Sequence, residues 1–129
     1  MQIGTVSERS GVPAKTIRYY ESIGLIAEAP RTDGGYRDYD ERDVATLRFI
    51  QRARSLGFSV SEVGDLLALW RDQGRASAQV KRLAERHVED IDRKVAELRG
   101  MRATLVDLME RCHGDERPDC PIIDDLAGR

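Results

Sequence analysis

The stretch IGTVSERSGVPAKTIRYYESIGLI, residues 3–26, decides the fold, because it has the pattern of two short helices joined by a tight turn. Gly11 can take the left-handed conformation that ends a helix, and Pro13 suits the start of the next one. The apolar residues that recur at helical spacing around this turn are Ile3, Val6, Val12, Ile17, Ile23 and Leu25. The stretch therefore predicts a helix-turn-helix, a motif that is also common in proteins that do not bind DNA.

The next segment, AEAPRTDGGYRDYD at residues 27–40, suits a small β-hairpin. It has a proline, a DGG turn, and Tyr36, Arg37 and Tyr39 close together after the turn. Directly after a helix-turn-helix, such a hairpin would be a wing, and Arg31, Tyr36 and Arg37 are the donors it could present to phosphates. The alternative is an ordinary solvated hairpin whose arginines bind water.

Two further helices are predicted after the hairpin. Asp40 and Asp43 form an acidic start for a helix in VATLRFIQRARSLG. Ser59 and Glu62 have the spacing of a capping box, which favours a second helix in VSEVGDLLALWRD. Each run places apolar residues on one face, so both helices are expected to pack against the helix-turn-helix.

A long helix is predicted from residue 77 to about residue 110, where there is no proline. Apolar residues recur there in steps of three and four, at Ala84, Val88, Ile91, Val95, Leu98, Leu105 and Met109. Such a helix is about 50 Å long, too long to bury its apolar row against the small preceding unit. We expect it to pair with a second copy of the chain; the alternative is a solvated helix in a monomer. His87 on this helix is interpreted as a packing or surface residue rather than a ligand.

The composition supports a small, mostly helical protein. The 129 residues are 40% hydrophobic and 34% charged, enough for one modest domain or for a small domain with an extended element. The fold class is all-α with one small hairpin. The net charge of -2 does not by itself indicate a nucleic-acid partner, so DNA binding would depend on where the cations lie. There is no membrane-length apolar run, signal-peptide pattern or catalytic motif, so we expect a cytoplasmic protein that is not an enzyme.

The only two cysteines, Cys112 and Cys120, lie in the segment CHGDERPDCPII with seven residues between them. In a reducing compartment such a pair indicates a metal site, a redox pair or chance placement. Structural zinc takes four nitrogen or sulfur ligands, and one chain offers two sulfurs with His113 at best. Two thiolates alone suit a soft ion such as Cu(I), which accepts linear two-coordination. Gly114 and Pro118 fit a bent loop around one such ion.

The runs TIRYYESIGL, GGYRDY, ARSLGFS and CHGDERPDCPII together resemble the MerR family of transcription regulators and its copper-efflux, CueR-like branch. The resemblance covers essentially the whole chain. It implies a winged helix-turn-helix at residues 1–75, a dimerisation helix at residues 76–110 that pairs as an antiparallel coiled coil, and a metal-binding loop with a C-terminal turn at residues 111–129. It also implies that the metal-bound dimer bends and untwists promoter DNA.

The resemblance assigns roles to individual residues. The metal ligands that it implies are Cys112 and Cys120. The DNA-binding residues that it implies are Lys15, Arg18, Tyr19 and Tyr20 in the recognition helix, Arg31, Tyr36 and Arg37 in the wing, and Arg54 in the following helix. Branches that sense zinc, mercury or lead have a cysteine near the start of the long helix, where this chain has Ser77. This difference favours a monovalent ion.

The resulting hypothesis is a Cu(I)-responsive regulator that binds double-stranded promoter DNA as a homodimer, acts on RNA polymerase there and activates copper-efflux genes. No membrane partner is expected. Ag(I) and Au(I) are chemically similar to Cu(I) and stay open as the sensed ion. A thiol-redox sensor on the same scaffold is a second hypothesis, and a metallochaperone or coiled-coil adaptor that does not bind DNA is a third.

Overall fold

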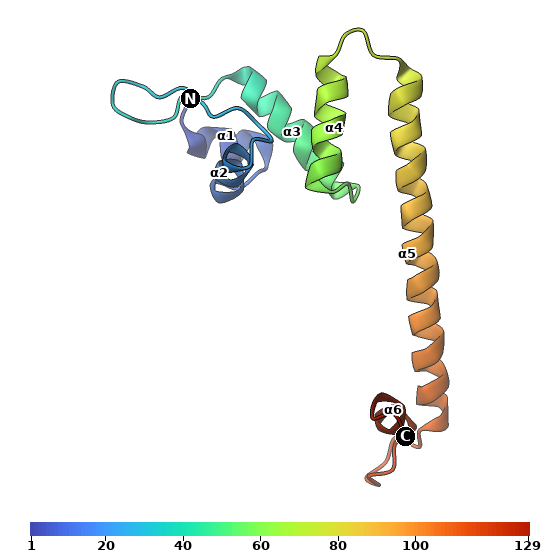
Figure 1. Ribbon diagram of the computed structural model, residues 1–129. Coiled ribbons are helices and arrows are strands. Elements are labelled where there is room, and N and C mark those ends of the chain that lie inside the picture. Colours follow the sequence, from blue (N-terminus) through green and yellow to red (C-terminus); the bar gives the residue numbers. More distant parts are fainter. The chain divides into compact units, whose positions relative to one another are not determined.

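The computed structural model describes residues 1–129 and divides the chain into two compact units, Met1–Val80 and Lys81–Arg129. Figure 1 shows the elements in order, and the helices are α1 (Ile3–Ser10), α2 (Ala14–Ser22), α3 (Glu41–Ser55), α4 (Val60–Arg71), α5 (Ser77–Arg111) and α6 (Pro121–Leu126). The predicted helical class is therefore confirmed. None of these helices combines the length and the apolar character needed to cross a lipid bilayer.

The helix-turn-helix forms as the sequence predicts. Gly11 ends α1 with a φ of 77°, and its N–H donates to the Ser7 carbonyl at 3.0 Å. Only glycine adopts this left-handed conformation without strain. Pro13 occupies the N-cap position of α2, so this helix starts without a side-chain cap. Ile23, one of the apolar residues of the pattern, is 45% exposed and does not join the core.

The core of the first unit is formed where α1 packs on α2 and α3, and α3 packs on α4. Burying one aliphatic side chain of this kind contributes about 1.5–3 kcal/mol. Its fully or almost fully buried aliphatic side chains are Val6, Val12, Ile17, Val44, Leu47, Ile50, Val63 and Leu67. Trp70 on α4 is 41% exposed and stacks on Phe49 with ring centroids 4.5 Å apart.

The predicted capping box of α4 is confirmed, and the acidic start predicted for α3 is a capping box as well. At the start of α3, Asp40 accepts the Asp43 N–H at 3.1 Å, and Asp43 accepts the Asp40 N–H at 2.9 Å. At the start of α4, Ser59 accepts the Glu62 N–H at 3.1 Å, and Glu62 accepts the Ser59 N–H at 2.8 Å. Each motif satisfies two backbone N–H groups that have no partner inside the helix.

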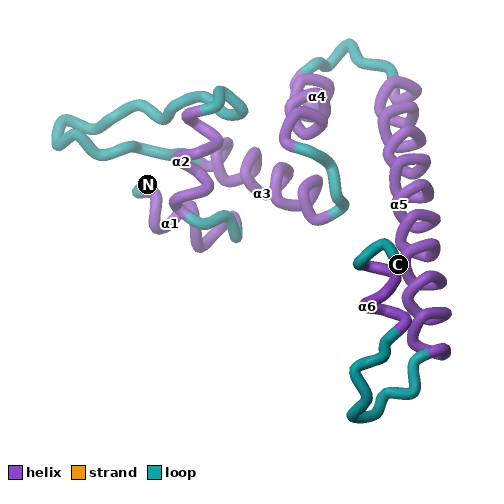
Figure 2. The backbone as a smooth tube through the Cα atoms, turned by 60° about the horizontal axis from the view of Figure 1, so that its bottom comes forward, coloured by secondary structure: helices purple, strands orange, loops and turns teal.

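The wing segment does not form the two strands that the hairpin prediction requires. It contains one isolated antiparallel bridge, between Arg31 and Arg37, and Figure 2 draws it as loop throughout. The Thr32 N–H donates to the Tyr36 carbonyl at 2.7 Å, which closes the tip. A two-stranded ribbon this short is marginal in water, and Pro30 removes a backbone donor from it. The chain reversal is present, but regular strands are not.

The second unit consists mainly of α5, whose observed extent agrees with the predicted one. Its 35 residues correspond to a length of about 52 Å. In the single chain most of the predicted apolar row is exposed, namely Val88, Ile91, Val95, Leu98, Leu105 and Met109. Near its end, Leu108 is buried beside α6, which folds back against α5 (Figures 1 and 2). The apolar row therefore has no partner within one chain.

Replacing Asp40 with alanine should lower the free energy of unfolding by about 0.5–2 kcal/mol, because the N-cap acceptor of α3 is lost. Urea unfolding at one fixed protein concentration, followed by circular dichroism, measures this change. Asp33→Ala removes an exposed wing carboxylate of the same type and should change the free energy by less than about 0.5 kcal/mol. Equal losses in the two variants would contradict the capping role of Asp40.

Candidate metal centre and nucleic-acid interface

The structure brings the two cysteine thiols together at the junction of α5 and α6. Cys112 directly follows α5, and its N–H donates to the Met109 carbonyl at 3.1 Å. Cys120 is the N-cap residue of α6. The two sulfur atoms lie 3.8 Å apart, and both cysteines are free and half-buried. The loop between them therefore closes on itself with the two thiols at its base.

The sulfur separation fits two ligands of one metal ion. A disulfide bond needs about 2.05 Å between the sulfurs. With metal–sulfur bonds of about 2.3 Å, a bent dithiolate needs about 3.8 Å between its sulfurs and a linear one about 4.6 Å. A linear ion would thus require the sulfurs to move apart by less than about 1 Å, which rotation of the side chains supplies.

The thiolate form of Cys120 is favoured by its position at the start of α6. The pKa of Cys120 is lowered, chiefly because the backbone N–H of Ile123 donates to its sulfur. Partial burial opposes this shift, and the N–H of Ile122 and the thiol of Cys112 add to it. Pro121 at the first helical position has no N–H, so the donors come from the two residues after it. Because thiolates are the ligands of soft metals, this favours metal binding.

The remaining polar residues of the loop do not join the two thiols. Asp115 accepts hydrogen bonds from the Arg117 backbone N–H at 2.9 Å and from its side-chain Nε at 2.8 Å. His113 is exposed, and Gly114 bends the loop with a φ of 65°. Within one chain, no third histidine, cysteine, aspartate or glutamate groups with the two sulfurs. The site can thus offer one ion two soft ligands.

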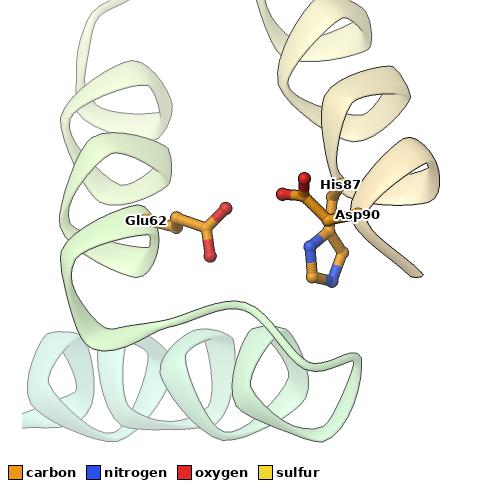
Figure 3. Close-up of side chains that lie close together, drawn as sticks. All are labelled: Glu62, His87 and Asp90. Atoms are coloured by element: carbon orange, nitrogen blue, oxygen red, sulfur yellow. The ribbon is translucent and has the colours of Figure 1, made fainter. Parts of the chain in front are cut away.

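Figure 3 shows three other ionisable side chains, Glu62, His87 and Asp90. Glu62 on the first turn of α4 accepts the N–H of Ser59. Asp90 on α5 forms an ion pair with Arg93. His87 lies three residues before Asp90, and two donors from one helix are fewer than a structural zinc ion takes. We assign no metal to these residues, in keeping with the interpretation of His87.

The second candidate site is the exposed face of α2. Lys15, Arg18 and Tyr19 lie on this face, and the side chain of Tyr19 is 52% exposed. Tyr20 is only 6% exposed, because it packs with Ile17 in the core. The helix therefore presents three of the four predicted side chains to solvent and keeps the fourth beneath them.

Cationic side chains from α2 and the wing surround one open hollow of about 320 Å³. Arg18 comes from α2, whereas Arg31, Tyr36 and Arg37 come from the wing. The Arg31 guanidinium donates to the Gly35 carbonyl at 2.8 Å, which holds it along the wing. The residues that line the hollow are Gln2, Ile3, Arg18, Arg31, Gly35, Tyr36 and Arg37. Four of the predicted DNA-binding residues therefore meet at one surface.

Two predicted residues are also held by contacts inside the protein. Arg54 on α3 is exposed and donates to the Phe58 carbonyl at 2.6 Å. Arg37 lies 3.3 Å from Glu21 and 3.8 Å from Glu28. The sequence analysis missed Glu21, whose side chain is only 3% exposed. A signal was available, because Glu21 follows the buried Ile17 by four residues and so lies on the inward face of α2.

Comparison with known proteins shows similarity along the whole chain. The family descriptions that match are "MerR HTH family regulatory protein" over residues 1–70 and "MerR, DNA binding" over residues 44–108. "Heavy metal-dependent transcription regulator 2" of Rhizobium meliloti is 55% identical, over 98% of this chain and 86% of that protein. The regulator CueR of Salmonella typhimurium is 41% identical, over 99% and 93%. The structure of PbrR691 from Ralstonia metallidurans with lead(II) matches 98% of both chains, with a TM-score of 0.85 and 32% identity.

In a Cys112→Ser variant, alkylation of the remaining Cys120 by iodoacetamide should have a pH midpoint below the value of about 8.5 for a free cysteine. The reason is the Ile123 N–H, which stabilises the thiolate in the folded chain. The same variant unfolded in urea is the control and should return to about 8.5. Coincident midpoints for the folded and unfolded protein would contradict the lowered pKa.

Proposed function

The chain belongs to the MerR family of transcription regulators, and from this premise we propose that it is a Cu(I)-responsive activator of copper-efflux genes. Members of this family are DNA-binding regulators and not enzymes, and they bind promoter DNA as homodimers. The relatives named above include heavy-metal regulators and CueR. The proposal includes copper as the sensed metal, copper-efflux genes as the targets and RNA polymerase as a partner. It places the protein in the cytoplasm, without a membrane partner.

The single observation that carries the proposal is the pair of thiols 3.8 Å apart with no third ligand beside them in the chain. Two thiolates are the donor set of a soft, low-coordination ion. A monovalent ion leaves the dithiolate with one negative charge, whereas a divalent ion would neutralise it. Ser77 is exposed at the first residue of α5, in place of the cysteine of the divalent-sensing branches.

We propose the same roles for the three segments of the chain as the sequence predicts. Residues 1–75 bind DNA, residues 76–110 form the dimer, and residues 111–129 hold the metal. The exposed apolar row of α5 supports pairing with a second copy, because about 25 cal/mol is gained for each Å² of apolar surface removed from water. The pair would be an antiparallel coiled coil, which gives a dimer with two DNA-binding units and two metal loops.

The proposed DNA contacts come from exposed side chains of α2, α3 and the wing. Cations on one surface can bind phosphates although the whole chain has a net charge of -2. Tyr20 would support α2 from the core rather than reach the DNA, because it is buried. The proposed DNA-contacting residues are Lys15, Arg18, Tyr19, Arg31, Tyr36, Arg37 and Arg54, with Tyr20 as the buried support.

The mechanism follows from the position of the thiols. When bound, Cu(I) would supply a soft cation held by the thiolates of Cys112 and Cys120. Holding it would fix the end of α5 and the start of α6 in one arrangement, and this would shift the dimer between conformations that already exist. Bending a site of 20–30 base pairs costs on the order of 1–6 kcal/mol. A preference of this size for the dimer shape that fits bent DNA is enough to activate the promoter.

The same pair of thiols supports one competing function, a thiol-redox sensor that forms a disulfide between Cys112 and Cys120. Titration with Cu(I) against a competing chelator separates the two hypotheses. A copper sensor retains the ion against the chelator, whereas a redox sensor binds it weakly and responds to peroxide. Ag(I) and Au(I), titrated in the same way, test whether other monovalent ions are sensed.

Replacing either Cys112 or Cys120 with serine should abolish the copper response and leave promoter binding unchanged, because each variant removes one of only two ligands. Transcription from the chain's own upstream promoter, with and without Cu(I), measures the response, and a mobility shift measures binding. His113→Ala in the same loop is the matched control and should respond like the wild type. Copper activation that survives Cys120→Ser would refute the site.

Replacing Ser77 with cysteine should extend the response to divalent ions such as Zn(II), because a further thiolate can enter the coordination sphere. The measurement is promoter activation across a panel of monovalent and divalent ions. Ala76→Ser is a control that adds a hydroxyl but no thiol at the neighbouring position and should leave the metal range unchanged. A Ser77→Cys variant with the wild-type metal range would count against the proposed role of this position.

A further inference from the structure

A buried carboxylate connects the recognition helix to the wing. Glu21 lies near the end of α2, and its side chain is only 3% exposed. Its Oε1 accepts a hydrogen bond from the Tyr39 hydroxyl at 2.6 Å. Its Oε2 accepts one from the Ala29 N–H at 3.1 Å and lies 3.3 Å from Nε of Arg37. All three partners belong to the two ends of the wing segment.

A carboxylate this buried is costly unless its oxygens are paired. Both oxygens of Glu21 are paired, and each uses a partner from the wing segment. Tyr39 is buried as well, and its pKa is raised, first by burial and then by the hydrogen bond to Glu21, so its hydroxyl stays a donor at neutral pH. The contact therefore depends on the wing ends lying against α2.

The wing is also held at its end by Met1, whose amino group donates to the Tyr39 carbonyl at 2.6 Å and to Asp38 at 2.9 Å. It contains one isolated bridge and no strand, and Arg31 and Tyr36 at its tip are exposed. Arg37 contacts both parts of this surface. Its Nε lies against Glu21, and the same side chain lines the hollow beside Arg18. Glu21 is the group that lies between the helix and these wing residues.

We infer that Glu21 is a positioning residue for DNA binding. Glu21 fixes the wing against α2, so that Arg18, Arg31 and Tyr36 contact one stretch of DNA. The inference rests on the proposed DNA contacts. Glu21 itself is not a DNA contact, because its side chain is buried and a carboxylate would repel phosphates. Its removal should therefore weaken binding even though the change makes the protein less negative.

Glu21→Gln in the full-length protein tests this, with binding to the chain's own upstream promoter followed by fluorescence anisotropy at several salt concentrations. We expect a dissociation constant at least about 10-fold higher. The slope of log K against log salt should fall by about one to two, because each lost phosphate contact contributes about 0.9. Glu28→Gln removes the same charge from an exposed partner of Arg37 and should change the affinity by less than about 2-fold.

A double-mutant cycle separates positioning from general loss of stability. Arg31→Ala should weaken wild-type binding but have a smaller effect in the Glu21→Gln background, where the wing is already displaced. Lys15→Ala, on α2 outside the hollow, should weaken binding equally in both backgrounds. Circular dichroism checks folding. Tyr39→Phe keeps the ring and removes only the hydroxyl, so it gives the same test if Glu21→Gln does not fold.

An unchanged affinity and salt slope in folded Glu21→Gln, or equal effects of Arg31→Ala in both backgrounds, would overturn the inference. If Arg31→Ala does not weaken wild-type binding, the proposed contact set is wrong and the inference is wrong with it. Copper titration of Glu21→Gln tests the metal proposal separately, since the cysteine loop is unchanged and should bind Cu(I) as in the wild type.

Discussion

A 35-residue helix with an exposed apolar row, in a chain of 129 residues, is the constraint on which the rest of the structure depends. The first unit uses its own apolar residues to fill its core, and α6 covers only the end of α5 around Leu108. The remaining apolar surface of α5 is exposed in the single chain. The proposed dimer would cover it, with a DNA-binding unit and a proposed metal loop in each copy.

The proposed metal loop depends on only two residues. Cys112 is fixed by the end of α5 and Cys120 by the start of α6, so the two sulfurs come together without help from the charged residues between them. Hard oxygen donors such as Asp115 are engaged within the loop. The donor set is thus reduced to two soft atoms, and ligand softness, coordination number and charge together favour a monovalent ion.

The DNA-binding unit has a cationic surface although the whole chain has a net negative charge. The chain carries slightly more acidic than basic residues, yet the surface formed by α2 and the wing is lined by arginines and a tyrosine. One carboxylate beside this surface, Glu21, is buried and paired. Burial thus removes a negative charge from the surface and uses it to hold the wing, which overall composition could not reveal.

The sequence by itself determined the local elements: the glycine that ends α1, the acidic start of α3, the capping box of α4, the length of α5 and the identity of the two candidate ligands. These depend on residues close together in the chain, where spacing and backbone preference act directly. Only the tertiary structure decided that the two thiols lie 3.8 Å apart, that Tyr20 and Glu21 point into the core, and that the wing forms a single bridge instead of two strands. Each of these depends on contacts between segments distant in sequence, because packing determines which polar groups are buried and which donors reach them.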